Sequence, residues 1–149
     1  MRLQLIPGAL DSPTPPPARA VRRVLFVCTA NSARSHLAAA LWRRASNVPA
    51  VSAGTHPGPA IDPGAVAAAE RHHLPLPRLR PRHISDVRQA GDLVITVCDR
   101  AHEELSEAGA VHWSVPDPVP LGDPDSFDAA LAQLAGRVER LAPRLAAVS

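Results

Sequence analysis

Two short apolar segments constrain the fold of this chain more than any other feature of its sequence. Residues 23–28 (RVLFVC) and 92–98 (DLVITVC) are apolar at nearly every position and rich in β-branched side chains. A strand without polar alternation is typically buried on both faces, as in a parallel sheet covered by helices. The two segments therefore predict strands of an α/β domain.

Strand-like and helical patterns alternate around these two segments. The further expected elements are strands at 50–53 (AVSA) and 111–113 (VHW), and helices at about 33–45, 63–73, 99–109 and 124–147. Asp62 before Pro63 and Asp123 before Pro124 are typical helix starts, and Gly109 is a typical helix end. The alternation predicts right-handed crossovers between parallel strands.

The last expected helix carries a regular apolar stripe. Apolar residues recur every three or four positions, which predicts a face packed on the core rather than a partner-binding zipper. The stripe consists of Phe127, Leu131, Leu134, Val138, Leu141 and Leu145. Pro143 predicts a kink near the end of this helix.

The domain organisation follows from length and proline content. A chain of 149 residues is long enough for one hydrophobic core. Residues 1–20 cluster prolines and are predicted to be a tail or linker, leaving 21–149 as a single three-layer α/β domain. We expect about four parallel strands with helices on both faces, and a surface loop in the proline-rich segment 71–83.

Composition narrows the classes of function and partner. With 46% hydrophobic residues, 20% charged residues and a formal net charge of +2, the chain fits a soluble globular protein without a nucleic-acid partner. No apolar run reaches the roughly 18 residues of a membrane span, so we expect no membrane association and a cytoplasmic location. In a reducing cytosol, Cys28 and Cys98 would not form a permanent disulfide.

The residues that follow the first strand predict a binding loop for an oxyanion. The sequence CTANSARS places five small residues between Cys28 and Arg34, so that successive backbone N–H groups can surround one tetrahedral anion. Arg34 can add a bidentate contact to two anion oxygens. The predicted substrate-binding residues are Thr29, Ala30, Asn31, Ser32, Ala33 and Arg34.

Cys28 has two alternative interpretations. An isolated cysteine at the end of an apolar strand is commonly a small core residue. The loop amides, the helix N-terminus, Arg34 and the Ser35 hydroxyl would instead stabilise a thiolate and lower the pKa of the thiol. We therefore expect Cys28 to be an ionised nucleophile at neutral pH.

The C-x5-R-S pattern resembles the active-site loop of the low-molecular-weight protein tyrosine phosphatase superfamily, over about residues 21–146. The resemblance implies the phosphotyrosine protein phosphatase I-like fold, with Cys28 as nucleophile and an Asp in a late loop as general acid. This sequence departs from the family pattern at Ala30, where a Gly is usual, and at Ala33, where a second Cys is frequent. Asn31 is retained and, since Asn tolerates left-handed backbone, is expected to brace the loop.

Two Asp-Pro pairs compete for the role of general acid. Asp123 is explained by capping the helix that opens with Pro124, whereas Asp117, in HWSVPDPV, caps nothing evident in the sequence. The position of Asp117 also matches the late loop of the family. We therefore predict Asp117 as the acid, and as the later base that activates water.

The resemblance includes two branches with different chemistry. Phosphotyrosine phosphatases carry aromatic residues at the mouth, where this chain has Val119 and the neighbourhood of Thr55 and His56. The segments DLVITVC and HWSVPDP are closer to the thiol-coupled arsenate reductases, whose second cysteine corresponds to Cys98. Their third cysteine is replaced by Leu105, which leaves two routes: a low-molecular-weight thiol resolves the adduct on Cys28, or Cys98 forms a disulfide with Cys28 that an external thiol or redoxin reduces. The alternative interpretation of Cys98 is a buried apolar residue at the end of its strand.

The sequence predicts no metal site and no tightly bound cofactor. It contains no C-x2-C pair for zinc. The potassium site implied by the arsenate reductase branch is incomplete, because a Glu of the first helix is replaced by Ala39. Only Asn31, Ser52 and Asp86 remain for it.

Three functions stay open at this point. The leading hypothesis is reduction of arsenate to arsenite. The alternative is hydrolysis of phosphotyrosine, in a phosphoprotein, or of a small phosphomonoester through a phosphocysteine. The third is a noncatalytic module that senses phosphate or arsenate. All three place an oxyanion beside Cys28, but only reduction needs a second thiol.

Overall fold

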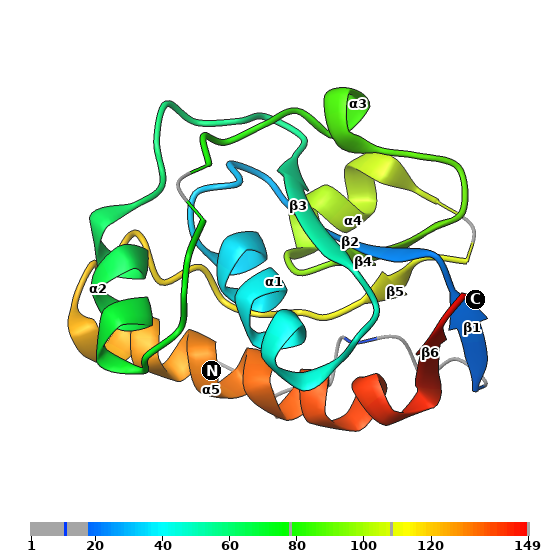
Figure 1. The fold of residues 1–149 in the computed structure, drawn as a ribbon. Helices are drawn as coiled ribbons and strands as arrows, with labels where there is room; N and C mark the ends of the chain where they lie inside the picture. The colour runs from blue at the N-terminus through cyan, green and yellow to red at the C-terminus, as the bar shows by residue number, and fades with distance from the viewer. Residues whose placement is uncertain (1–10, 12–17, 78, 108, 149) are drawn as a thin grey trace, which may run out of the picture.

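The molecule is built on a four-stranded parallel sheet with strand order β3-β2-β4-β5 (Figure 1). The computed structural model describes residues 11, 18–77, 79–107 and 109–148. The strands are β2 Arg23–Cys28, β3 Ala50–Gly54, β4 Asp92–Thr96 and β5 Val111–His112. The two apolar segments form strands, as predicted, and lie at the centre of the sheet. The α/β class with parallel strands is confirmed.

Helices cover both faces of this sheet (Figure 1). They are α1 Arg34–Ala45, α2 Pro63–Arg71, α3 Ile84–Val87, α4 Asp99–Leu105 and α5 Pro124–Leu141. On one face α1 packs against β2, β3 and α5, and α2 packs against α5. On the other face α4 packs against β2 and β4. Among the described residues, no helix is both long and apolar enough to cross a lipid bilayer.

The end of the chain differs from the prediction of one helix to residue 147. Helix α5 ends at Leu141, the 3-10 turn η1 spans Ala142–Arg144, and strand β6 spans Leu145–Ala147. Pro143 has no backbone N–H to continue the helical hydrogen bonds, and its ring clashes with the preceding turn. The predicted kink is therefore a termination.

Strand β6 pairs in parallel with β1, Arg19–Val21, to form a second, two-stranded sheet that the sequence did not indicate. Strand β1 begins two residues before Val21, the expected start of the domain. Apart from Asp11 and Ala18–Ala20, the predicted tail lies outside the described residues.

Four other elements end earlier than predicted, and one of them is β5, which ends at His112 rather than 113. Helix α2 ends at Arg71, and His73 lies in the left-handed region with φ 55°. Helix α4 ends at Leu105, because Ser106, with φ 43°, takes the left-handed position that was expected of Gly109. Strand β4 ends at Thr96 rather than 98, since Cys98 already caps α4.

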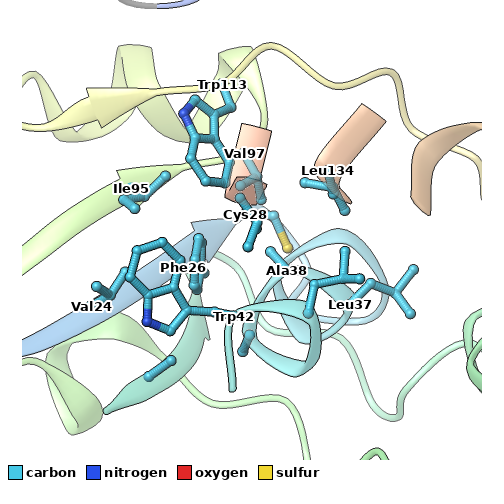
Figure 2. Close-up of a cluster of buried hydrophobic side chains, with 14 of the residues drawn as sticks. Val24, Phe26, Cys28, Leu37, Ala38, Trp42, Ile95, Val97, Trp113 and Leu134 are labelled. Atoms are coloured by element: carbon cyan, nitrogen blue, oxygen red, sulfur yellow. The ribbon is translucent and has the colours of Figure 1, made fainter. Parts of the chain in front are cut away.

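The core lies between the sheet and helices α1 and α5. Phe26 of β2 is fully buried, with its ring centroid 6.0 Å from that of Trp42 and 5.7 Å from that of Trp113 (Figure 2). The predicted stripe of α5 is buried, and Leu145 is buried as well, but from β6. Full burial of each large apolar side chain contributes about 1.5–3 kcal/mol. This packing fixes the end of β2, where Cys28 borders the same cluster (Figure 2).

Candidate active site

Cys28 lies at the point where the strand order of the sheet reverses. The chain leaves β2 toward β3 on one side and later returns to β4 on the other. Crevices at the carboxyl ends of such strands are the usual ligand sites of α/β sheets. A pocket of about 540 Å³ opens here, lined by Cys28, most of the following loop, Cys98 and the segment 114–117.

The loop after β2 is held through its carbonyl groups. The carbonyls of Cys28, Thr29, Ala30 and Ser32 accept hydrogen bonds of 2.8–3.1 Å from backbone N–H groups of the segment 55–62. The N–H groups of Thr55, His56, Gly58 and Asp62 are the respective donors.

This arrangement fixes the direction of the loop amides. In a trans peptide the N–H points opposite to the carbonyl of the preceding residue. The N–H groups of Thr29, Ala30, Asn31 and Ala33 therefore point away from the segment 55–62. In the described part of the chain, none of the N–H groups from 29 to 33 donates to a backbone carbonyl. These free donors form the kind of concave nest that binds anions.

Asn31 braces the loop from inside. Its backbone lies in the left-handed region with φ 50°, and the residue is completely buried. Its side-chain Oδ1 accepts from the backbone N–H of Arg82 at 2.9 Å, while Nδ2 donates to Ser35 Oγ at 2.7 Å.

The Ser35 hydroxyl links Asn31 to the sulfur. Ser35 Oγ lies 3.0 Å from Cys28 Sγ. Because Asn31 already donates to this oxygen, the hydroxyl hydrogen is free to donate to the sulfur. A donor held in this direction stabilises a thiolate more than a thiol.

The charge state of Cys28 corrects the prediction from the sequence. Burial raises the pKa of the Cys28 thiol, and it outweighs the opposing effects of the Ser35 hydroxyl, the Ser35 N–H and the Arg34 guanidinium. The apolar pattern of the strand does not reveal how deeply the thiol is buried, and so does not reveal how much burial raises its pKa. The thiol is therefore not held ionised at neutral pH by the protein groups alone, contrary to the expectation.

Arg34 and Asp117 meet across the pocket. Arg34 Nη1 donates to the carbonyl of Val115 at 2.8 Å, and Nη2 lies 3.6 Å from Asp117 Oδ2. The Asp117 side chain is 44% exposed, and its Oδ1 accepts from the N–H of Val119 at 3.1 Å. Asp117 thus caps a local turn, which the sequence did not reveal.

Asp123 has the structural role that was predicted for it. Its side chain accepts from the Ser126 N–H at 3.2 Å and caps α5. This contact accounts for Asp123 without any catalytic role, so Asp117 remains the candidate acid.

Cys98 lines the same pocket as Cys28. It is the N-cap of α4, and its sulfur accepts from the N–H of Ala101 at 3.4 Å. The sulfur also lies 3.3 Å from Thr29 Oγ1, so a residue of the binding loop contacts the second thiol. Both cysteines are buried free thiols.

Gly54 is a site residue that the sequence analysis missed. It ends β3 and pairs with Cys28. A Cβ at this position would lie 2.6 Å from the Thr29 carbonyl oxygen and 3.0 Å from Asn31, so only glycine lets the loop pack on β3. The signal was available as the glycine that directly follows the AVSA strand.

The predicted mouth residues are not among the residues that line the pocket. Thr55 is buried, and His56 Nε2 lies 2.7 Å from Glu104 Oε2. Neither residue lines the pocket, nor does Val119. Among the described residues, the pocket lining includes no aromatic side chain.

The residues present do not fit the implied potassium site. Both polar atoms of the Asn31 side chain are engaged within the loop. The Arg82 guanidinium donates to the Ser52 carbonyl at 3.4 Å, which brings a positive charge to that carbonyl. Asp86 is exposed on α3. Within the described ranges, no group of three or more His, Cys, Asp or Glu residues could hold a metal ion.

Comparison with known proteins assigns the chain to a family. The family model described as low molecular weight phosphotyrosine protein phosphatase matches residues 23–148. No curated protein matches the chain.

Solved structures with the same fold come from both branches. An arsenate reductase from Archaeoglobus fulgidus is 26% identical, with 80% of this chain and 98% of that chain covered and a TM-score of 0.67. A YwlE mutant from Bacillus subtilis is 25% identical, with 82% and 97% covered and a TM-score of 0.68. The tyrosine phosphatase Wzb from Escherichia coli K30, in complex with sulphate, shares the fold at 24% identity, 83% and 97% coverage and a TM-score of 0.69. The chain therefore belongs to the low molecular weight phosphotyrosine protein phosphatase family, and is an enzyme of the superfamily that contains these phosphatases and arsenate reductases.

Proposed function

We propose that this enzyme is a thiol-coupled arsenate reductase that converts arsenate to arsenite. The observation that carries the proposal is the second thiol, Cys98, in the wall of the pocket that contains Cys28. Hydrolysis of an ester would need only one thiol. The contact of Cys98 with Thr29 keeps this sulfur beside the binding loop.

The reaction needs both sulfurs in turn. The Cys28 thiol transfers its proton to an arsenate oxygen as its sulfur attacks arsenic. An S–As bond forms, the As–O bond to the protonated oxygen breaks, and that oxygen leaves as water. The Cys98 thiolate then attacks the Cys28 sulfur, and the S–As bond breaks with its electron pair remaining on arsenic. Arsenic(V) becomes arsenic(III), arsenite leaves, and the two thiols become a disulfide that an external thiol or redoxin reduces.

The loop supplies the oxyanion contacts in this scheme. Its inward amides and Arg34 would hold the arsenate oxygens, as they would hold those of phosphate. The lack of an aromatic side chain in the described lining also favours a small inorganic oxyanion over a phenyl ring. Free thiols on both cysteines suit a reducing compartment such as the cytoplasm.

The test measures arsenite formation and the mass of the protein after one turnover. The wild type, reduced and then exposed to arsenate, should form one arsenite and lose two mass units as the Cys28–Cys98 disulfide forms. Cys98→Ser should not form this disulfide, and should lose at least about 100-fold in turnover with a dithiol reductant. If Cys98→Ser turned over as fast as the wild type, the second thiol of the reaction would come from the external reductant and not from Cys98. If the wild type formed no arsenite, the proposal would be rejected.

A second candidate, phosphomonoester hydrolysis, is favoured by one observation. Asp117 faces Arg34 at the pocket, where a carboxyl group can protonate a leaving oxygen and then activate water against a phosphocysteine. The substrate would be a phosphoprotein or a small phosphomonoester.

The test of this candidate compares two leaving groups. Asp117→Asn should lower hydrolysis of phenyl phosphate about 10²-fold or more, because phenolate needs a proton to leave. Hydrolysis of p-nitrophenyl phosphate, whose leaving group is more acidic, should fall less. An equal fall for both esters would exclude Asp117 as the acid.

A further inference from the structure

One charged residue lies on the buried face of α5. Arg137 is only 4% exposed and sits among the apolar stripe residues of this helix. A buried guanidinium destabilises a protein by several kcal/mol unless a counter-charge and hydrogen-bond acceptors surround it. Arg137 therefore requires a partner that the helix itself does not supply.

That partner comes from the other end of the chain. Asp11 forms a bidentate ion pair with Arg137: Oδ2 accepts from Nε at 2.8 Å, and Oδ1 accepts from Nη2 at 3.3 Å. The remaining contacts of the guanidinium go to the carbonyls of Gln133, at 3.0 Å, and Ser114, at 3.1 Å. The two side chains are 3% and 17% exposed, so the pair is largely shielded from water.

The pair holds both backbone groups of Ser114. The Ser114 carbonyl accepts from Arg137, and the Ser114 N–H donates to Asp11 Oδ1 at 2.8 Å. Ser114 belongs to the pocket lining and lies directly after the core residue Trp113. The ion pair therefore anchors the first part of the segment 114–119.

The anchored segment carries two contacts of the candidate active site. Val115, the next residue, accepts from Arg34, and Asp117 lies two residues further on, opposite the same guanidinium. A shift at Ser114 would thus move the acceptor of Arg34 and the candidate acid together. Misplacing catalytic groups by about 1 Å can lower a rate by 10²-fold.

We propose that Asp11 is a positioning residue that, through Arg137 and Ser114, sets the segment bearing Val115 and Asp117 against the Cys28 loop. Asp11 precedes the family match, which begins at residue 23. Asp11, a residue of the predicted tail, is therefore part of the catalytic domain in this proposal. The kinetic test of this role rests on the proposed function, whereas the test by hydrogen exchange does not.

The experiment compares three variants of the full chain. Asp11→Ala leaves Arg137 as an unpaired buried cation. Asp11→Ala/Arg137→Met removes both charges and avoids that penalty. Asp92→Ala is the matched control, because Asp92 accepts two hydrogen bonds, of 2.7 and 2.8 Å, from Arg23 at the start of β2, the end of the sheet opposite to the pocket.

Three quantities are measured on each variant. Amide hydrogen exchange reports the Ser114 N–H, thermal unfolding reports stability, and steady-state kinetics report kcat and KM for arsenate and for phenyl phosphate. We expect Ser114 exchange at least tenfold faster in both Asp11 variants. We also expect kcat to fall about tenfold, with KM changed less than twofold, in both.

Stability separates positioning from a merely structural role. Stability should fall in Asp11→Ala and recover in the double variant, while kcat should stay low. Asp92→Ala should lose stability without changing Ser114 exchange or kcat. Recovery of kcat together with stability, or unchanged Ser114 exchange in Asp11→Ala, would overturn the proposal. If the wild type turns over neither substrate, the proposed function fails by itself. Ser114 exchange then tests the role of Asp11: faster exchange in both Asp11 variants supports it, and unchanged exchange overturns it.

Discussion

Cys28 is the last residue of β2 and Cys98 lies just beyond the end of the neighbouring strand β4, yet the chain continues from the two cysteines differently. After Cys28, at the end of β2, five residues form a loop before α1 begins at Arg34. After Cys98, which follows β4, helix α4 begins at once, and the Cys98 sulfur accepts the N–H of Ala101 as its cap.

This difference decides which backbone groups remain for a ligand. At Cys28 the loop carbonyls are occupied by the segment 55–62, so the loop amides are left for an oxyanion. At Cys98 the sulfur itself satisfies an amide of the helix start. The same residue type at the ends of neighbouring strands is thus the proposed nucleophile beside an anion-binding loop at one junction, and the N-cap of a helix at the other.

The largest expected effect comes from removing the proposed nucleophile. Cys28→Ser should lower turnover of arsenate and of aryl phosphates by at least about 10⁴-fold, since a serine hydroxyl without an adjacent base does not attack. Inorganic phosphate, measured by calorimetry, should still bind within a few-fold of the wild-type affinity. Turnover within tenfold of the wild type would mean that the two cysteines have been assigned the wrong roles.

The next largest effect tests the support beneath the Cys28 loop. Gly54→Ala should push the loop away from β3, lower turnover about 10²-fold and reduce the free energy of unfolding by about 1–3 kcal/mol. The matched control is Gly136→Ala in α5, where the nearest neighbour of the new Cβ is the flexible end of Arg140. That change should stabilise the protein by up to about 1 kcal/mol, as alanine does within helices. Full activity in Gly54→Ala would show that the loop tolerates displacement.

An intermediate effect tests the donor chain to the sulfur. Asn31→Ala frees the Ser35 hydroxyl to turn away, so the pKa of the Cys28 thiol should rise further and alkylation by iodoacetamide at pH 7 should slow about tenfold. Because burial already raises this pKa, the alkylation rate should increase with pH through the alkaline range in both proteins. Asn47→Ala, at an exposed position after α1, serves as the control. An unchanged pH profile in Asn31→Ala would disprove the donor chain.

The smallest effect is expected at the second junction. Cys98→Ser retains a side chain that caps α4, so stability should change by no more than about 0.5 kcal/mol. Hydrolysis of p-nitrophenyl phosphate should stay within twofold of wild type, in contrast to the loss expected for arsenate. A large loss with the ester would mean that Cys98 supports the loop rather than the redox step.

Features encoded by neighbouring residues were predictable from the sequence. The central strands, the start of α5 at Pro124 and the loop between Cys28 and Arg34 all follow from short-range patterns. The resemblance of CTANSARS to the family loop then supplied the fold and the choice of Asp117. Such patterns express backbone preferences that act within a few residues.

Features that depend on distant partners were not predictable. The clash that requires Gly54 arises only when β3 lies beside the loop. The raised pKa of Cys28 depends on burial by the whole core. Ser106 ended α4 before Gly109 could, against the usual preference for glycine in left-handed backbone. The contact between Asp11 and Arg137 spans 126 positions, and no local pattern indicated it.

The backbone bonds between the Cys28 loop and the segment 55–62 also bear on how the protein can be redesigned. They involve only main-chain atoms, so the identity of most side chains in that segment does not enter them. Substitutions at the exposed residues His56 or Ala60 would therefore alter what approaches the pocket, while the backbone geometry of the anion-binding loop stays unchanged. The backbone contacts that shape the anion-binding loop are thus independent of the side chains that would contact the rest of a substrate.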